Sequence, residues 1–181
     1  MHFTIGELLL DLVQNAANAR SSRIRVVWSE RNRRLELSVE DDGAGMAPEI
    51  VARATDPFYT DGVAHPDRVV GLGLAFLRQT AETTGGEFRL SSEPGRGTSV
   101  GLDVPSDHVD LPPRGDVVDT LVMVLCTGGP REIEIVRETD VGSYTLRKSE
   151  LEEVLEELSS VEGRGLLREY VRSQEDEIWQ R

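Results

Sequence analysis

The sequence contains one cysteine and one lysine, and each scarcity excludes a class of site. Cys126 alone cannot form an intrachain disulfide or a cysteine-built zinc site. It stands in the apolar run 121–126, so we expect a buried, unreactive thiol. Lys148 is the single lysine in a total of 20 basic residues, and its surroundings are not glycine-rich. A phosphate site in this chain therefore cannot be a P-loop, which requires a lysine after its glycines.

Long apolar runs and excess positive charge are also missing. No stretch approaches the roughly 18 apolar residues of a membrane span, and no secretion signal opens the chain, so we expect a cytoplasmic protein with no membrane segment. The formal charge of −13 argues against a general nucleic-acid binder, because phosphate backbones need clustered cations. An acidic surface instead favours basic protein partners. Much of this charge lies in residues 132–181, which contain 14 acidic and 7 basic residues.

Helical and strand periodicities are mixed along residues 1–105. Thr4 and Glu7 form a capping-box pattern at the start of a helix that should end at residues 20–22. Pro48 should open a short helix to about residue 54, and helical spacing returns from Gly73 to Gly85 after a loop. Strand patterns joined by polar turns occupy residues 24–28, 35–39, 88–91 and 99–104, with the first turn expected over 30–34. This mixture predicts an α+β sandwich rather than a doubly wound parallel sheet.

The rest of the chain is expected to be a proline-containing linker, residues 106–115, and an acidic α/β extension, residues 116–181. In the extension, Asp116 should cap a helix to about residue 127, and Ser149 should cap an acidic helix. A hairpin is expected from residues 131–138 and 143–147, and a last helix from about Gly165 to Trp179.

Three blocks of polar and glycine residues stand in a definite order. On the first helix, Glu7, Asp11, Asn15 and Asn18 share one polar face opposite the leucines. A glycine-rich turn, residues 41–46, follows the second strand, and Gly-Leu-Gly-Leu at 71–74 enters a helix. Free N–H groups and the helix dipole at such a glycine-rich N-terminus suit a phosphate and need no lysine.

Together these blocks resemble the N, G1 and G2 boxes of the GHKL superfamily, the Bergerat-fold ATPases that include gyrase, MutL and histidine kinases. Residues 56–60 resemble the F box of the histidine-kinase branch, and Gly97-Thr98 resembles its closing strand motif. The resemblance covers about residues 4–104. It implies a two-layer α/β sandwich with a mixed, mostly antiparallel sheet and helices on one face, and it implies ATP and Mg²⁺ as ligands.

The resemblance also implies roles for individual residues. Asn15 would hold Mg²⁺, for which an amide oxygen is a suitable hard ligand, and Asp11 would be the general base. Other branches carry Glu or Asn at the position of Asp11, so the shorter side chain predicts slow hydrolysis. Asp41 would accept a hydrogen bond from the adenine amine, and Arg68 would either contact the γ-phosphate or be solvated. The residues expected to bind the nucleotide are Asn15, Asn18, Asp41, Gly43, Gly45, Met46, Phe58, Arg68, Gly71, Leu72, Gly73, Leu74 and Thr98.

None of the three histidines, His2, His65 and His108, has the helical context of a phosphoacceptor. The sequence therefore predicts an ATP-binding regulator that acts in trans as a protein kinase or slow ATPase on a protein partner. Two alternatives stay open: a non-catalytic ATP/ADP sensor that docks through its C-terminal half, and an anti-sigma-factor-like serine kinase. Residues 107–116 also resemble a linker in small stand-alone ATP-binding proteins that we associate with hydrogenase and NADH-oxidoreductase gene clusters, which suggests a redox partner.

Overall fold

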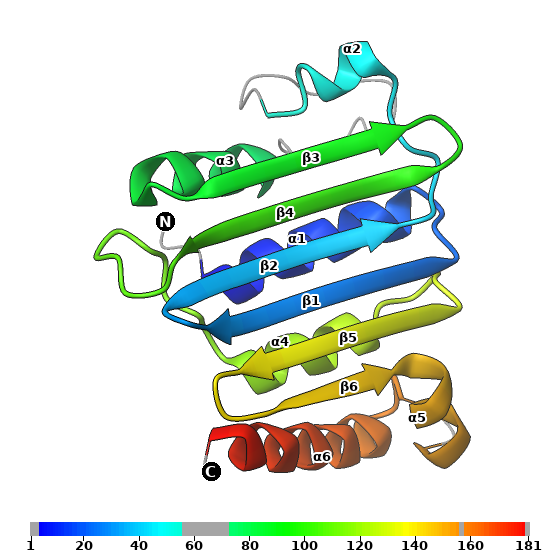
Figure 1. The fold of residues 1–181 in the computed structure, drawn as a ribbon. Coiled ribbons are helices and arrows are strands. Elements are labelled where there is room, and N and C mark those ends of the chain that lie inside the picture. The colour runs from blue at the N-terminus through cyan, green and yellow to red at the C-terminus, as the bar shows by residue number, and fades with distance from the viewer. Residues whose placement is uncertain (1–3, 56–72, 156–157, 180–181) are drawn as a thin grey trace.

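One six-stranded sheet organises the chain, in the strand order β3-β4-β2-β1-β5-β6 (Figure 1). The computed structural model describes residues 4–55, 73–155 and 158–179. All neighbouring strands are antiparallel except β1 and β5, which are parallel, so the predicted α+β class with a mixed, mostly antiparallel sheet is confirmed. The elements are α1 (Ile5–Asn18), β1 (Arg23–Arg31), β2 (Arg34–Asp41), α2 (Pro48–Val51), α3 (Gly73–Thr84), β3 (Glu87–Glu93), β4 (Gly97–Pro105), α4 (Val117–Leu125), β5 (Glu132–Thr139), β6 (Ser143–Arg147), α5 (Lys148–Leu155) and α6 (Val161–Trp179).

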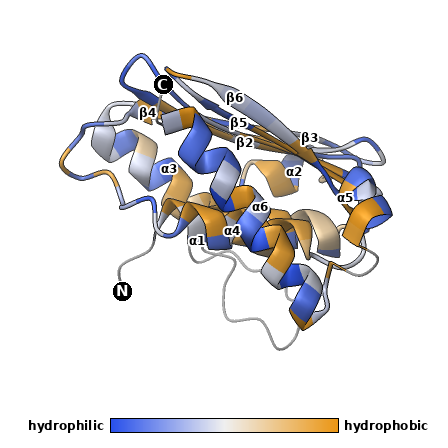
Figure 2. Cartoon of the chain, turned by 90° about the horizontal axis from the view of Figure 1, so that it is seen from below, coloured by the Kyte–Doolittle hydropathy of each residue, from blue (hydrophilic) through white to orange (hydrophobic). Residues whose placement is uncertain are grey.

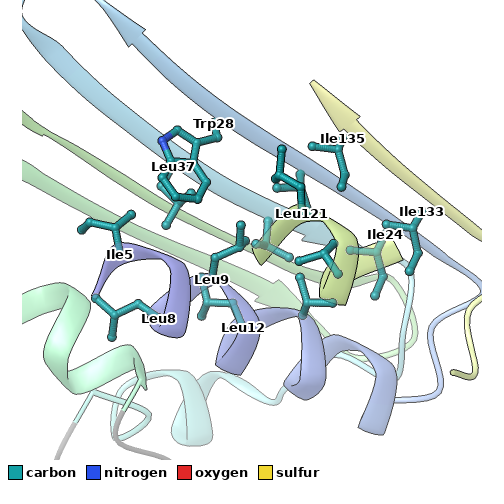
Figure 3. Packing of buried hydrophobic residues seen from close by; sticks show 14 of the residues in the cluster. Ile5, Leu8, Leu9, Leu12, Ile24, Trp28, Leu37, Leu121, Ile133 and Ile135 are labelled. Carbon is teal, nitrogen blue, oxygen red and sulfur yellow. The ribbon is translucent and has the colours of Figure 1, made fainter. Parts of the chain in front are cut away.

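Helix α1 begins where the capping box predicts. The Glu7 amide donates to Thr4 Oγ1 at 3.1 Å, and the Thr4 amide donates to Glu7 Oε2 at 2.8 Å. These reciprocal bonds satisfy N–H groups that have no partner within the helix. Leucines at helical spacing then bury one face of α1 against the sheet, where Figure 3 shows Leu8, Leu9 and Leu12 among the core side chains.

The helices α1, α3, α4 and α6 lie on one side of the sheet, and no helix among the described residues covers the other face (Figures 1 and 2). The core fills the space between these two layers. Strand side chains alternate between the layers, so most apolar side chains face the helices and most charged ones face outward; Glu30 and Arg137 are charged residues at inward, buried positions. Among the helices that the structure describes, none has both the length and the apolar composition of a transmembrane segment.

The turn between β1 and β2 is shorter than predicted. We expected a turn over residues 30–34, but the strands extend to Arg31 and resume at Arg34. Asn32 and Arg33 alone make the turn, with φ angles of 52° and 59°. Two consecutive left-handed residues give the hairpin geometry that matches strand twist. The prediction was wrong because polar residues at strand ends resemble a loop.

The C-terminal residues continue the same sheet. Strand β5 pairs with β1 from Arg23↔Glu132 to Glu30↔Thr139, and the predicted β5–β6 hairpin is confirmed. The stretch expected as a linker packs on the start of α1, where the Ile5 amide donates to the Pro113 carbonyl at 2.9 Å. Strands β5 and β6, although far away in the sequence, therefore share one hydrophobic core with residues 1–105.

Two helix starts in this part differ from the prediction. Helix α5 begins at Lys148, and Ser149 lies inside its first turn, where the hydroxyl bonds to the Glu132 carboxylate instead of capping. Helix α6 begins at Val161, because Ser160 Oγ accepts the Gly163 amide at 2.9 Å and so caps the helix four residues earlier than expected.

Cys126 is half-buried rather than fully buried. Its thiol donates to the Leu158 carbonyl at 3.3 Å. Burial raises the pKa of this thiol, although the positive charges of Arg164 and Lys148 oppose the shift. The thiolate is therefore disfavoured at neutral pH, which agrees with the predicted unreactive cysteine.

Candidate functional site

A cavity of about 190 Å³ lies between α1, the start of α3 and the ends of β2 and β4. It gathers six of the residues that the sequence predicts to bind a nucleotide: Asn15, Asp41, Gly45, Met46, Leu74 and Thr98. Its other walls come from Leu12, Ala16, Ala19, Val39 and Val100. A mainly apolar pocket with a few polar groups is typical of small-molecule sites.

Asp41, the last residue of β2, provides the carboxylate of this cavity. Its Oδ1 accepts the Gly43 amide at 2.7 Å, and the Thr98 backbone N–H also bonds to it. Burial raises the pKa of Asp41, the two backbone hydrogen bonds partly oppose this, and the neighbouring charge of Asp42 adds to the rise. The pocket thus presents a partly desolvated acceptor to which a bound donor would be worth more than in water.

Asp42 has a structural role. Its two oxygens accept the amides of Ser22 and Arg23 at 2.7 and 2.8 Å and the Ser22 hydroxyl at 2.7 Å. Burial acts to raise the pKa of Asp42, but these hydrogen bonds outweigh it and hold the pKa below its ordinary value. The residue joins the end of β2 to the loop between α1 and β1.

Ser92 on β3 is a member of the site that the sequence did not reveal. Its Oγ accepts the Met46 amide at 2.8 Å, donates to the Gly97 carbonyl at 3.0 Å, and lies 2.9 Å from Thr98 Oγ1. It therefore joins the glycine-rich turn to the Gly-Thr motif on β4. Ser92 could be found only as the strand partner of Thr98. That pairing follows from the β3–β4 register, which the sequence alone does not provide.

The two glycines of the turn after β2 are required by the chain's own backbone. A Cβ at Gly43 would lie 2.8 Å from both the Ala19 carbonyl oxygen and Asp41 Oδ1. Gly45 has a φ of +64°, and a Cβ there would overlap the Glu93 carbonyl. The space that a side chain would need at these two positions is occupied by Ala19 after α1, by the end of β2 and by the β3–β4 turn. Among the described residues, Gly45 lines the cavity and Gly43 does not.

Asp11, Asn15 and Gly73 meet where α1 contacts α3. Asn15 Nδ2 donates to Asp11 Oδ2 at 3.2 Å, which places the Asn15 amide oxygen on the side of the group away from Asp11. A Cβ at Gly73 would overlap Asp11 Oδ2, so the first turn of α3 packs directly on this carboxylate. The polar face of α1 and the glycine-rich start of α3 are therefore neighbours.

Asn18, another predicted residue, does not line the cavity. Asn18 is exposed on α1, and its Oδ1 accepts Gln14 Nε2 at 3.2 Å. Phe58, Arg68, Gly71 and Leu72 lie outside the described residues, and so does the F-box resemblance at 56–60.

The side chains around this cavity fit a metal ion that is held mainly by a bound nucleotide and by water, with few protein ligands. Within the described ranges, no three His, Cys, Asp or Glu side chains come close enough to form a metal site by themselves. Asn15, which lines the cavity, contributes a neutral amide oxygen. Mg²⁺ usually keeps several waters and takes one or two protein ligands beside substrate phosphates, so this set fits Mg²⁺ bound together with a nucleotide.

The fold and the cavity define a two-layer α/β sandwich with a ligand-sized pocket between its helices and the end of its sheet. Residues 3–108 match the family described as histidine kinase-, DNA gyrase B- and HSP90-like ATPase. The match covers more than half of the chain, and the chain therefore belongs to this family.

Relatives of the same region are kinases. The chain is 31% identical over 104 residues to the sensor histidine kinase DcuS of Escherichia coli (strain K12), a match that covers 58% of this chain and 18% of DcuS. It is 34% identical over 104 residues to the histidine protein kinase DivJ of Caulobacter vibrioides, covering 56% of this chain and 17% of DivJ. The chain thus spans less than a fifth of the length of these relatives.

A solved structure resembles a larger part of the fold. The N-terminal domain of a DNA repair protein matches 80% of this chain and 51% of its own, with a TM-score of 0.54 and 14% sequence identity. This likeness shows the fold alone.

Proposed function

We propose that the chain binds ATP with Mg²⁺ in the 190 Å³ cavity and regulates a protein partner by transferring the γ-phosphoryl group in trans or hydrolysing it slowly. The observation that carries the proposal is the half-buried Asp41 carboxylate among apolar walls, in a chain that belongs to an ATPase family. A buried acceptor of this kind selects a ligand with a matching donor, and the exocyclic amine of adenine is one.

Different residues around Asp41 contact different parts of the nucleotide. Leu12, Val39 and Val100 offer apolar surface to the faces of a base. Ser92 and Gly97 hold Thr98 and Met46 in place through the Ser92 hydroxyl. At the other end, the backbone N–H groups of the first turn of α3 face the phosphates.

Asp11 and Asn15 would serve the transfer step. Mg²⁺, held through Asn15 and the phosphates, would neutralise charge on the transferred group. Asp11 lies one helical turn before Asn15 and is hydrogen-bonded to it at 3.2 Å. It would accept the proton of the attacking hydroxyl or water as the bond from that oxygen to the γ-phosphorus forms and the bond to the β-phosphate oxygen breaks.

Action on a partner is supported by the relatives and by the surroundings of His108. The relatives described above are a sensor histidine kinase and a histidine protein kinase. In the part of the chain that the structure describes, the one histidine is His108, which lies in a turn and accepts the Asp110 amide at 3.2 Å. A turn gives this imidazole no helical acceptor context, so His108 gives no support to transfer within the described residues, and the proposed acceptor is on a protein partner.

Calorimetric titration with Mg-ATP tests the binding step. Asp41→Ala should weaken binding by at least about a hundredfold, because it removes a hydrogen bond to a charged group and leaves the amine unpaired. Glu40→Ala is the matched control, since Glu40 precedes Asp41 on β2, is exposed, and should bind like wild type. Absence of binding by wild type, or undiminished binding by Asp41→Ala, contradicts the proposal.

Radiolabelled ATP turnover separates catalysis from sensing. Asp11→Asn retains the size of the side chain and removes the base, so turnover should fall while Mg-ATP affinity changes little. A wild-type protein that binds ATP but shows no turnover with or without candidate partners would instead be a nucleotide sensor.

A further inference from the structure

An open apolar groove lies at the end of the sheet away from the nucleotide cavity. Its lining residues come from strand β6 and from helices α5 and α6, which lie at the lower end of the sheet in Figure 1. The volume is about 470 Å³. We call it the β6–α5–α6 groove; its lining residues include Leu146 on β6, Leu151, Val154 and Leu155 on α5, and Leu166 and Tyr170 on α6.

Large apolar side chains in this groove are exposed to solvent. Val154 is 78% exposed, Leu166 is 49% exposed and Tyr170 is 45% exposed. They converge on one groove from two helices, whereas single exposed apolar residues are scattered on most surfaces. A gathered apolar surface of this kind is typical of a binding site.

Helix α6, one side of the groove, is already fixed by packing elsewhere. Leu167 and Val171, on a neighbouring face of α6, are fully buried in the core. Glu175 further along α6 accepts Arg137 Nε at 3.0 Å and the Tyr144 hydroxyl at 2.6 Å. A preformed groove loses little conformational entropy when it binds.

The spacing of the lining residues favours a helix as the occupant. Leu151 and Leu155 are four residues apart on α5, and Leu166 and Tyr170 are four residues apart on α6. Each pair is a stripe along its own helix, and two such stripes facing one space accept the apolar face of a third helix.

The charge around the groove favours a basic partner. Arg147 on β6 is already neutralised by Glu134 and Glu150, both at 3.0 Å. Lys148 is directed into the chain, where Nζ donates to the Thr127 carbonyl at 3.1 Å. Exposed carboxylates stand next to lining residues in the sequence: Glu153 directly precedes Val154 on α5, and Glu169 directly precedes Tyr170 on α6.

We propose that the β6–α5–α6 groove docks an amphipathic helix of a protein partner, with its apolar side chains in the groove and lysines or arginines along its flanks. The groove lies apart from the nucleotide cavity, and the two share no lining residue. The docking proposal therefore holds or fails without nucleotide, and its test is independent of the proposed ATP site.

A synthetic helical peptide provides the test, measured by fluorescence anisotropy on the full chain. The probe has about fourteen residues, or four helical turns, with leucines at three- and four-residue spacing and lysines elsewhere. It should bind wild type, and Tyr170→Ala and Leu166→Asp should each weaken binding at least about tenfold. The added negative charge of Leu166→Asp would attract a basic peptide, so a loss there reports the groove and not general charge.

Val161→Asp is the matched control for that charge. Val161 is on the same helix and 85% exposed, and it does not line the groove. Its variant should bind the peptide like wild type. Circular dichroism melting of each variant checks folding, and Tyr170→Ala keeps the test valid if Leu166→Asp is unstable.

Four results would overturn the proposal. Equal binding by wild type and both groove variants would show attraction by surface charge alone. Equal binding of the same peptide with glutamate in place of lysine would show that the groove does not prefer a basic partner. Tighter binding of a peptide with alternating leucine and lysine would assign the surface to an added strand. A dimer in sedimentation that Leu166→Asp dissociates would assign the groove to a second copy of this chain.

Discussion

Asp41 is the residue whose protonation should control nucleotide affinity. Because burial raises its pKa above the ordinary value of 3.8, the carboxylate is lost at a higher pH than for an exposed aspartate. The ionised form is the stronger, charge-assisted acceptor for the adenine amine. ATP affinity should therefore be full well above this raised pKa and fall as pH decreases through it.

The measurement is Mg-ATP affinity across an acidic pH series, expressed as the ratio of wild type to Asp41→Asn. Protonation of the phosphates affects both proteins and cancels in the ratio. For the protein without nucleotide the sign is opposite: a raised pKa means that ionised Asp41 costs stability, so its favourable contribution is present at low pH and lost as pH rises. A ratio that stays constant down to the ordinary aspartate pKa would contradict this role.

Ser92 should matter to both stability and binding although it contacts the nucleotide pocket only through other residues. Ser92→Ala leaves the Met46 amide without its acceptor and frees Thr98, so we expect a loss of about 1 to 2 kcal/mol in the free energy of unfolding. Mg-ATP affinity should fall severalfold as the turn loosens. Ser91→Ala, an exposed neighbour on the same strand, should change neither quantity.

For individual residues, the sequence predicted much of the lining of the pocket but not the residues that hold that lining in place. Asn15, Asp41 and Thr98 belong to motifs with fixed spacing, and the structure brings them to one cavity. Ser92 has no such motif, because its role depends on which strand lies beside it. Arg137 was also missed: it occupies an inward position in an alternating strand and is fully buried, whereas arginine is mostly exposed.

The contact between helices α1 and α3 depends on one glycine. Gly73→Ala would be favourable by helix propensity, by roughly 1 kcal/mol, but the added Cβ overlaps the Asp11 carboxylate. We expect a lower melting temperature and reduced ATP turnover, since Asp11 must move. Gly165→Ala on α6 is the matched control: a Cβ there meets nothing within 4 Å, so that variant should gain about 0.5 to 1 kcal/mol.

Whole elements followed from the sequence more fully than their boundaries did. The capping box at Thr4 and the cap at Asp116 are confirmed because each depends on residues within one helical turn. The start of α6 was missed because no cap was predicted at Ser160, and the cap predicted at Ser149 for α5 is wrong because its hydroxyl bonds to Glu132, which is distant in sequence. The parallel pairing of β1 with β5 joins residues more than a hundred positions apart, for which no local pattern exists.

A buried polar network joins the C-terminal half to the rest of the molecule. Arg137 on β5 bonds to Glu30 of β1 at 2.9 Å and to Glu175 of α6 at 3.0 Å. Its guanidinium lies 5.6 Å from the Trp28 ring centroid and 5.8 Å from that of Trp179. These are the only two tryptophans in the sequence, so intrinsic fluorescence reports on this network.

Through this network the extension and the ATPase domain should unfold as one unit. Glu30 also bonds to Arg114, whose carbonyl accepts the Gly6 amide at the start of α1 at 3.0 Å. A continuous set of contacts thus runs from α6 to the helix that carries Asn15. If the sheet is one cooperative unit, a ligand at one end stabilises every part of it equally.

Trp179 can test this directly in a Trp28→Phe variant, where it is the sole tryptophan. Mg-ATP at a hundred times its dissociation constant should raise the free energy of unfolding by about 2.7 kcal/mol, and the Trp179 urea transition should shift together with far-UV circular dichroism.

Arg137→Gln in the same background leaves two carboxylates buried without their cation, which costs about 3 to 5 kcal/mol. Arg25→Gln removes an exposed ion pair of β1 and should cost less than about 1 kcal/mol. If Mg-ATP shifts the urea transition seen by circular dichroism but not the one seen by Trp179 fluorescence, the extension unfolds as an independent domain.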